Sequence, residues 1–414
     1  MNILIIGAGG REHAIAKSLI KNERVEKVFL SGNNGGAEGD IICHIMNPLD
    51  FVALDNFINA NNIELTIVGP EDPLNQGIVD FLESRNHLVF GPRKSAARLE
   101  GSKEFAKEFM NKYGINTAKH FACHSYDEAV EALENYGYPV VIKADGLCQG
   151  KGVYICKDQI EAMIALKEIF IDDKFSGQGS SVVIEEYLQG FEASLLCFVS
   201  GHKIYPFDTA MDYKKIYEGD LGPNTGGVGA ISPNPYWKQI HQKQSDEILV
   251  KIENGLEKEG LEFNGILFIG YMIHHDQVYV LEFNTRFGDP ETEVLLPRLT
   301  SDLLENIEQC INGQDVKLNF ADNVAMTTIL VSDGYPNKYD KAFEISGLDK
   351  LVGVELYHNG TSKNNGKVYT NGGRVLSIVG LSPSLEESRA LVYRELYKIK
   401  FDNMNYRRDI GKIK

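Results

Sequence analysis

The sequence has no long apolar run, no excess of basic residues and no paired cysteines, and each absence excludes a class of protein. Apolar stretches such as Ile266–Ile273 fall far short of the roughly 20 residues that span a bilayer, so we expect no membrane partner. The 42 Lys and Arg against 58 Asp and Glu give a net charge of −16, which argues against a nucleic-acid partner, because such a protein needs a basic face. The six cysteines have neither CxxC nor zinc spacing, and no basic secretory leader is recognisable, so we expect free thiols in a cytoplasmic protein.

Sequence motifs for a protein nucleophile or for catalytic zinc are also missing. The chain has no Ser/His/Asp arrangement, no HExxH and no GxSxG. His274 and His275 are adjacent, but neighbouring positions on a strand face opposite sides. Nucleophilic and zinc chemistry are therefore excluded.

The first 100 residues alternate between strand and helix patterns. Strands separated by single helices predict a parallel, doubly wound α/β domain. The expected strands and helices are Asn2–Ile6, Arg11–Lys21, Val25–Leu30, Phe51–Ala60, Ile63–Val68, Gly77–Glu83 and Leu88–Phe90. At roughly 150 residues per domain, the 414 residues suggest about three domains, and we expect them at 1–101, 102–324 and 325–414.

The second and third domains follow different patterns. Residues 117–186 predict a compact αβ lid, a helix is expected over Tyr236–Glu259, and the last 90 or so residues predict a small β-rich domain that ends in a helix. The other expected elements are the helices Ser102–Tyr113, Tyr126–Asn135 and Asp158–Phe170, the strands Thr117–Cys123, Pro139–Lys143, Ser181–Glu185, Gly265–His274, Val278–Phe283, Ala325–Val331, Gly353–Tyr357 and Gly373–Val379, and a helix from Leu385.

A glycine turn follows the first strand in Gly7-Ala8-Gly9-Gly10-Arg11-Glu12-His13. Backbone N–H groups at such a turn suit a phosphate. The third glycine of the dinucleotide fingerprint would fall at Glu12, and the second strand ends in Ser31–Asn33 rather than in an acid for a ribose. The turn thus indicates a phosphate site and not a nicotinamide site, with a ligand-free strand–helix turn as the alternative.

Lys143 ends an apolar strand and precedes a glycine-rich loop that contains Gly146, Gly150, Lys151 and Gly152. A lysine beside a buried strand is costly unless it meets an anion. A glycine nest with lysine point charges suits a triphosphate. For Lys151 the alternative is a solvated hairpin lysine.

Glu282 and Asn284 lie two residues apart on an expected strand and so share a face, which Arg286 would continue. A carboxylate and an amide oxygen suit magnesium, and arginine suits a phosphoryl oxygen. An ion pair between Glu282 and Arg286 is the alternative.

Two weaker signals are the acids Glu185, Glu186 and Glu192 and the loop Gly222–Gly227 with the preceding Asp212. The acids could accept hydrogen bonds from ribose hydroxyls, and the loop could hold an anionic or amino substrate. A charged strand end and an ordinary glycine-rich connector are the alternatives.

In chain order, Lys103, Lys143, the glycine-rich lid, a Glu-Glu-x-Leu hinge and a Glu-x-Asn-x-Arg strand resemble the ATP-grasp superfamily. Within it, the whole chain is similar to the phosphoribosylamine–glycine ligases, also called glycinamide ribonucleotide synthetases. The segments that carry the likeness are Gly7–Ala14, Val68–Gly77, Phe90–Lys107, Val141–Gly152, Gly219–Gly229, Leu281–Glu291 and Gly372–Leu376. This family usually has Asp-His-Lys-Arg where this chain has Asp212-Tyr213-Lys214-Lys215, and two acids where it has Phe191-Glu192, so the lysine pair receives no role and only Glu192 is carried over.

The resemblance implies an ATP-grasp fold, ATP and Mg²⁺ (or Mn²⁺) as cofactors, and ligation of glycine to 5-phosphoribosylamine through a glycyl phosphate. It implies Arg286 and Lys143 as catalytic residues and Glu282 with Asn284 as metal ligands. The implied ATP-binding residues are Lys103, Lys143, Gly150, Lys151, Gly152, Glu185, Glu186, Tyr187, Leu188 and Glu192. The implied substrate-binding residues are Gly9, Gly10, Arg11, His13, Asp212, Asn224, Thr225, Gly226 and Arg286.

We expect the two small molecules as partners and a monomer rather than an oligomer. Three alternatives stay open: another ATP-grasp carboxylate–amine ligase, a nucleotide-binding oxidoreductase, which Glu12 disfavours, and a non-catalytic nucleotide sensor.

Overall fold

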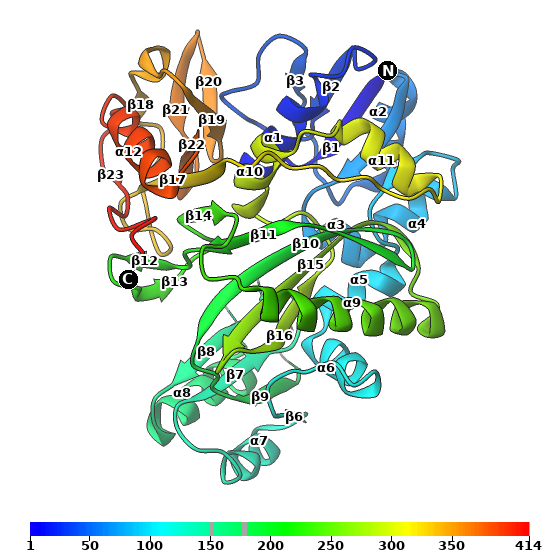
Figure 1. Cartoon of the computed structure of the whole chain (residues 1–414), viewed down its shortest axis with the longest axis vertical. Helices are drawn as coiled ribbons and strands as arrows, with labels where there is room; N and C mark the ends of the chain where they lie inside the picture. The colour runs from blue at the N-terminus through cyan, green and yellow to red at the C-terminus, as the bar shows by residue number, and fades with distance from the viewer. Residues whose placement is uncertain (149–151, 176–179, 414) are drawn as a thin grey trace.

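The structure is a computed structural model that describes residues 1–148, 152–175 and 180–413. The N-terminal domain and the C-terminal strands lie side by side at one end, a large sheet occupies the middle, and the lid forms the other end (Figure 1). Among the described helices, none is both long and apolar enough to cross a bilayer.

The N-terminal sheet is parallel throughout and has the order β3-β2-β1-β4-β5. Alternation along β1 buries Ile3 and Ile5 in one core and Leu4 and Ile6 in another, so helices cover both faces. The elements are β1 Asn2–Ile6, α1 Gly10–Leu19, β2 Lys27–Leu30, β3 Ile41–Cys43, α2 Phe51–Ala60, β4 Ile63–Val68, α3 Glu71–Gln76, α4 Ile78–Glu83, β5 Val89–Phe90 and α5 Lys94–Gly101. This confirms the predicted doubly wound domain.

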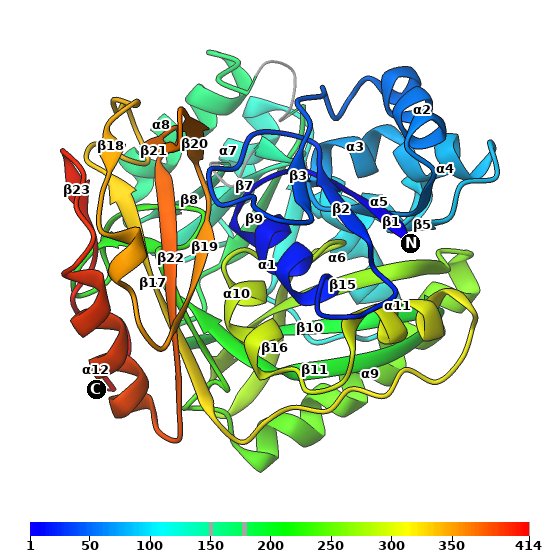
Figure 2. The same ribbon diagram turned by 90° about the horizontal axis from the view of Figure 1, so that it is seen from above.

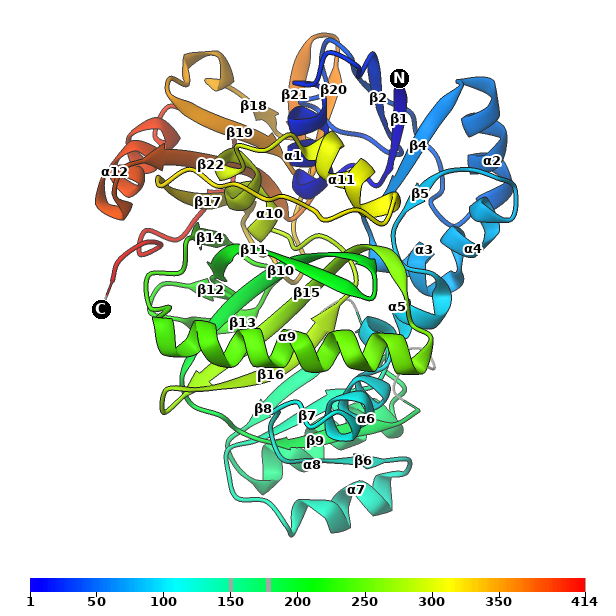
Figure 3. The same ribbon diagram turned by 45° about the vertical axis from the view of Figure 1, so that its right-hand side comes forward.

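The lid is an antiparallel sheet of order β6-β9-β7-β8 with its own core under two helices. Its elements are β6 His120–Cys123, α7 Tyr126–Leu133, β7 Val140–Ala144, β8 Val153–Cys156, α8 Gln159–Phe170 and β9 Val182–Glu186. Helix α6, Lys103–Lys112, leads into the lid from the N-terminal domain. Because these side chains pack largely among themselves, the lid is a separate packing unit below the central sheet (Figure 3).

The central antiparallel sheet has the order β16-β15-β10-β11-β14-β17-β22-β19. Its elements are β10 Phe191–Gly201, β11 Lys203–Asp212, β14 Gly229–Ser232, β15 Phe263–His274, β16 Gln277–Asn284, β17 Val324–Ser332, β19 Val354–His358 and β22 Arg374–Ser382, with β23 Met404–Asn405 beside β17. Helix α9, Gln239–Glu259, lies across this sheet (Figure 3). The C-terminal strands join the central sheet where β14 pairs with β17, a continuity that the sequence did not indicate.

The remaining elements surround this framework. They are β12 Lys215–Tyr217, β13 Leu221–Asn224, α10 Glu291–Leu295, a 3₁₀ turn at Leu296–Arg298, α11 Leu303–Ile311, β18 Glu344–Ile345, a 3₁₀ turn at Leu348–Lys350, β20 Thr361–Asn364, β21 Lys367–Thr370 and α12 Leu385–Leu396. Seen from above, α1 lies beside both α10 and β19 (Figure 2), so the N-terminal domain packs directly on the C-terminal strands.

Most predicted elements are present with ends shifted by a few residues. Helix α9, for example, begins at Gln239 and not at Tyr236. The hairpin of β10 and β11 and the short helices α3 and α5 were not predicted from the sequence. Almost all residues of β10 are buried because both faces of the strand are covered. Its sequence therefore lacks the alternation of apolar and polar residues that identifies a strand with one exposed face.

Candidate active site

A cleft of about 1090 Å³ runs between the lid and the central sheet. Its lining comes from β7 and β9 of the lid, from β16, from the β12–β13 hairpin and from the end of the chain. Of the predicted site residues, the cleft brings together Lys103, Lys143, Gly152, Glu185, Glu186, Tyr187, Leu188, Glu192, Asp212, Asn224, Thr225, Gly226, Glu282, Asn284 and Arg286. Gly150 and Lys151 lie outside the described residues.

Lys143 sits on β7 and shares a buried carboxylate with a second lysine. Its Nζ lies 2.9 Å from Glu185 Oε1, and Lys107 Nζ lies 3.2 Å from the same oxygen. Burial alone would raise the pKa of Glu185, but the two ammonium groups lower it overall. Two cations around one carboxylate leave a positive excess at the cleft wall, which suits polyphosphate.

Lys107 is a site residue that sequence reasoning missed. It lies on α6, is 3% exposed and donates to Thr117 Oγ1 at 2.7 Å. Burial lowers the pKa of Lys107 to about 8, although Glu185 opposes this shift. The available signal was its place four residues after Lys103, one helical turn on and so on the same helix face.

Lys103 begins α6 beside the loop that follows β7. Its Nζ donates to the Gly146 carbonyl, and Asp145 Oδ1 accepts from the backbone N–H groups of Lys103 and Glu104. A carboxylate at a helix N-terminus satisfies its free N–H groups. This contact joins the start of the glycine-rich loop to the body of the protein.

The hinge residues Glu186, Tyr187 and Leu188 follow directly after Glu185. Glu186 accepts the Lys119 backbone N–H at 2.7 Å, Tyr187 is exposed and Leu188 is buried. The carboxylate of Glu185 is occupied by its two lysines. If this stretch contacts a nucleotide base, the contact is therefore made by the backbone of residues 185–188 or by the side chains after Glu185.

Glu282 and Asn284 lie on β16 and both line the cleft, as their spacing predicted. Burial raises the pKa of Glu282, but the charges of Lys214, Lys143 and Lys103 lower it overall, so the carboxylate is ionised at neutral pH. Within the described part of the chain, no group of three or more His, Cys, Asp and Glu could hold a metal. A carboxylate and an amide fit Mg²⁺, which completes its shell with water and phosphate oxygens.

Lys214 stands among three carboxylates of the cleft. It pairs with Glu192, and the charges of Asp212, Glu192 and Glu282 raise its pKa well above the usual value although burial opposes this. Burial raises the pKa of Asp212 to about 8, against the effect of Lys214. The structure thus places in the cleft a lysine to which the sequence assigned no role.

Arg286 follows β16 and is held by acids of the N-terminal domain. Its Nη2 lies 3.0 Å from Glu100 Oε1 and its Nε 3.6 Å from Glu71 Oε2, and Nη2 also donates to Asn284 Oδ1 at 3.3 Å. Burial lowers the pKa of Arg286, but Glu100 and Glu71 raise it overall. Within the described residues, Arg286 forms its ion pairs with Glu100 and Glu71 and not, as the alternative would have it, with Glu282.

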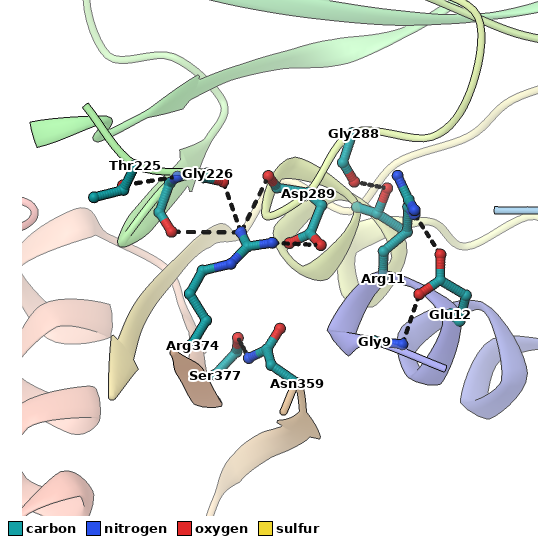
Figure 4. A network of polar contacts seen from close by, with 12 residues as sticks. Gly9, Arg11, Glu12, Thr225, Gly226, Gly288, Asp289, Asn359, Arg374 and Ser377 are labelled. Carbon is teal, nitrogen blue, oxygen red and sulfur yellow. Dashed lines mark hydrogen bonds and ion pairs between the residues drawn. The ribbon is translucent and has the colours of Figure 1, made fainter. Parts of the chain in front are cut away.

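The loop Gly222–Gly227 is clamped by Arg374 of β22 (Figure 4). Arg374 donates to the Gly226 carbonyl at 2.6 Å and to Asp289 Oδ2 at 2.8 Å. Thr225 Oγ1 and its backbone N–H both donate to the Lys214 carbonyl at 2.8 Å. These contacts fix the loop that presents Asn224, Thr225 and Gly226 to the cleft.

The glycine turn before α1 does not line the cleft and lies at the junction with the C-terminal strands. Glu12 Oε2 accepts the Gly9 N–H at 2.7 Å, and Arg11 Nε lies 2.6 Å from Glu12 Oε1 (Figure 4). A Cβ on Gly10 would come within 2.1 Å of side-chain oxygens of Asn359 and Glu293, so any larger residue would have to displace both side chains. Glu12 thus takes the place that a pyrophosphate would need, and a phosphoribosyl site at this turn stays a prediction.

His13 is a buried junction residue. Its Nδ1 accepts the His358 backbone N–H at 3.0 Å. Burial lowers the pKa of His13 to about 3 and that of His358 to about 4. Both rings are therefore neutral in the folded protein at neutral pH.

Comparison with known proteins places the chain in one family along almost its full length. Family models of phosphoribosylglycinamide synthetase match it in three parts: the N domain at residues 1–100, the ATP-grasp (A) domain at 101–292 and the C domain at 325–413. Phosphoribosylamine–glycine ligases of Caldanaerobacter subterraneus subsp. tengcongensis and Halalkalibacterium halodurans are 46% and 45% identical, covering 99% of this chain and 99% and 96% of theirs.

Solved structures agree with this relationship. Phosphoribosylamine–glycine ligase from Thermotoga maritima superposes with a TM-score of 0.88 at 34% identity, covering 99% of this chain and 100% of that one. The biotin carboxylase domain of Hydrogenobacter thermophilus 2-oxoglutarate carboxylase shares the fold with a TM-score of 0.75 at 14% identity over 98% of this chain and 91% of that one. The chain therefore belongs to the phosphoribosylglycinamide synthetase family, which has the ATP-grasp fold.

Proposed function

We propose that the protein is a ligase that joins glycine to 5-phosphoribosylamine in purine biosynthesis, with ATP converted to ADP and phosphate. The observation that carries this proposal is that Lys143, Glu282 and Asn284, from two different sheets, line one cleft in a chain related to these ligases over its whole length. Lysine charges and a carboxylate–amide pair are what ATP with magnesium requires.

The chemistry explains why the cleft holds charges and no nucleophile. A glycine carboxylate is a poor acyl donor at neutral pH, and transfer of the γ-phosphoryl group to it gives a glycyl phosphate. The amine of phosphoribosylamine then attacks the carbonyl carbon, the C–N bond forms and phosphate leaves. Such transfer depends on alignment and charge neutralisation rather than on covalent catalysis by the protein.

Within this proposal, Lys103 and Lys143 hold the ATP phosphates and the hinge Glu185–Leu188 holds the adenine. Glu192 accepts a hydrogen bond from a ribose hydroxyl, which requires its ion pair with Lys214 to break. Glu282 and Asn284 would hold Mg²⁺ (or Mn²⁺), which neutralises phosphate charge when bound. Gly150, Lys151 and Gly152 belong to the same ATP assignment.

The substrates fall to the opposite wall of the cleft. Arg286 and the loop residues Asn224, Thr225 and Gly226 contact glycine or its acyl phosphate. Asp212 accepts a hydrogen bond from a substrate amine. The turn with Gly9, Gly10, Arg11 and His13 would take the phosphoribosyl phosphate, which requires Glu12 to release the Gly9 N–H and the Arg11 guanidinium. The lid, about residues 117–186, closes over the cleft and excludes the water that would hydrolyse a glycyl phosphate.

The proposal includes a monomer with small-molecule partners and a cytoplasmic location. The six cysteines are free thiols, which suits a reducing compartment.

The direct test measures phosphate release from ATP and Mg²⁺, with glycine and freshly generated phosphoribosylamine added singly and together. We expect release only when both are present. Release with another carboxylate and amine would keep the ATP-grasp chemistry and refute the substrates, and ATP binding without any release would indicate a nucleotide sensor. Lys143→Met should remove turnover, while Lys157→Met, an exposed lysine of the same lid, serves as the matched control.

A further inference from the structure

A hairpin outside the main sheets carries part of the cleft wall, and Ile216 of its first strand packs with Ile329 and Val331 of β17. Strands β12 and β13 pair with each other and, within the described residues, with no other strand. Lys214 immediately precedes the hairpin, and Asn224 and Thr225 end it. Because a two-stranded hairpin is marginally stable at best, contacts from outside it must hold these cleft residues in place. Arg374 holds the loop after the hairpin at Gly226, which leaves the start and the turn of the hairpin to a further support.

The chain end supplies that support at the tip of the hairpin. Arg407 Nη1 donates to the Lys215 carbonyl at 2.8 Å, and its Nη2 donates to Asp220 Oδ1 at 3.0 Å. Asp409 accepts from Arg407 at 2.7 and 2.8 Å and also from the Gly219 N–H at 2.8 Å. One guanidinium thus joins β12, the turn of the hairpin and the chain end.

Arg407 is rigidly placed for this contact. It is 2% exposed, its guanidinium lies 5.2 Å from the centre of the Tyr213 ring, and its carbonyl accepts from Tyr393 Oη at 2.7 Å. Arg389 of α12 holds the next residues by donating to the Ile410 carbonyl at 3.1 Å. The planar five-donor group of arginine can make these contacts at once, whereas lysine cannot.

The same segment also reaches the cleft. Arg407, Asp409, Lys412 and Ile413 are among the residues that line it. The support and the substrate wall are therefore continuous.

We propose that Arg407 is a positioning residue of the ligase site, which sets the β12–β13 hairpin so that Lys214 and Asn224–Gly226 face the substrates. The effect on glycine binding rests on the proposed function, whereas the support of the hairpin by Arg407 does not depend on it. Loss of the contact frees the hairpin and weakens glycine binding, whereas the ATP phosphates are held by Lys103 and Lys143, which it does not touch.

The test compares Arg407→Gln and Arg407→Lys with Arg408→Gln, an exposed neighbour that serves as the control. Hydrogen exchange of residues 215–224 is followed by mass spectrometry in the full-length protein without substrates. We expect exchange about tenfold faster in both Arg407 variants, which corresponds to about 1.4 kcal/mol, and unchanged exchange in the control.

Kinetics then separate positioning from general stability. We expect the KM for glycine to rise about tenfold or more in Arg407→Lys, with the Kd of a non-hydrolysable ATP analogue and the melting temperature near those of the control. Asp220→Ala removes the acceptor of Arg407 Nη2 from the exposed hairpin and should reproduce the effect if Arg407→Gln does not fold.

Unchanged exchange in the hairpin, or faster exchange with an unchanged KM, would overturn the inference. If the unmodified protein shows no turnover, the proposed function fails, and the exchange experiment still decides whether Arg407 holds the hairpin.

Discussion

Replacing Arg286 by methionine tests whether this side chain serves the fold, the reaction or both. Its nitrogens lie 3.0 Å from Glu100 and 3.6 Å from Glu71, and Glu100 is 9% exposed. Methionine retains much of the apolar contact but leaves both carboxylates without their cation. Because breaking a buried pair strands a charge, we expect the free energy of unfolding to fall by about 3–5 kcal/mol.

The loss should depend on pH in a defined direction. Burial already raises the pKa of Glu100, and removal of Arg286 raises it further. A carboxyl group whose folded pKa is raised adds stability at low pH that is lost as the pH rises through that pKa. The variant should therefore lie closer to the unmodified protein at pH 5.5 than at pH 8.

A double-mutant cycle separates the two roles. Glu100→Gln removes the more buried of the two stranded charges, so Glu100→Gln/Arg286→Met should regain most of the stability lost by Arg286→Met. Guanidinium unfolding at both pH values gives the free energies, and phosphate release gives the activity. A stable but inactive double variant would assign Arg286 to the chemistry. If the free energy of unfolding of Arg286→Met lies within about 1 kcal/mol of that of the unmodified protein, the electrostatic reasoning is wrong.

Three further predictions concern the junction and the metal ligands. The pKa values of His13 and His358 are about 3 and about 4 in the folded protein, against about 6.5 in the unfolded chain. The free energy of unfolding should therefore be highest above about pH 6.5 and fall as the pH drops toward about 4. Urea unfolding at several pH values should show this slope, and His13→Gln should reduce it. Gly10→Ala places a Cβ 2.1 Å from Asn359 Oδ1, so calorimetry should show a destabilisation of about 1–3 kcal/mol, with Gly137→Ala, where nothing lies within 4 Å of the new Cβ, as the positional comparison. Glu282→Gln should leave the melting temperature nearly unchanged but raise the Mg²⁺ concentration needed for half-maximal turnover at least about tenfold, or about 1.4 kcal/mol; an unchanged requirement would remove the metal assignment.

Much of the secondary structure was readable because the sequence pattern and the packing agree. Strands β1 and β4 and helix α2 have the predicted bounds, since continuous apolar runs and helical spacing leave few other solutions. The shared face of Glu282 and Asn284 follows in the same way from the two-residue period of a strand.

Other features depend on contacts between distant segments, which no local pattern contains. Lys107 becomes part of the site only because α6 meets β9 of the lid at Glu185. Arg374 reaches Gly226 across 148 positions, and Arg407 reaches Lys215 across 192. From the local sequence alone, a charged residue is predicted to be exposed to solvent. Its burial can be recognised only when the residues that pair with it are known.

The sequence by itself determined the fold class, the order of the elements and the type of chemistry, because periodicity, glycine turns and the choice of charged residues are local properties. Only the tertiary structure decided which charges are free to meet a ligand. It committed Glu185 to two lysines from other elements, and Glu12 to its own turn, because buried charges must find partners.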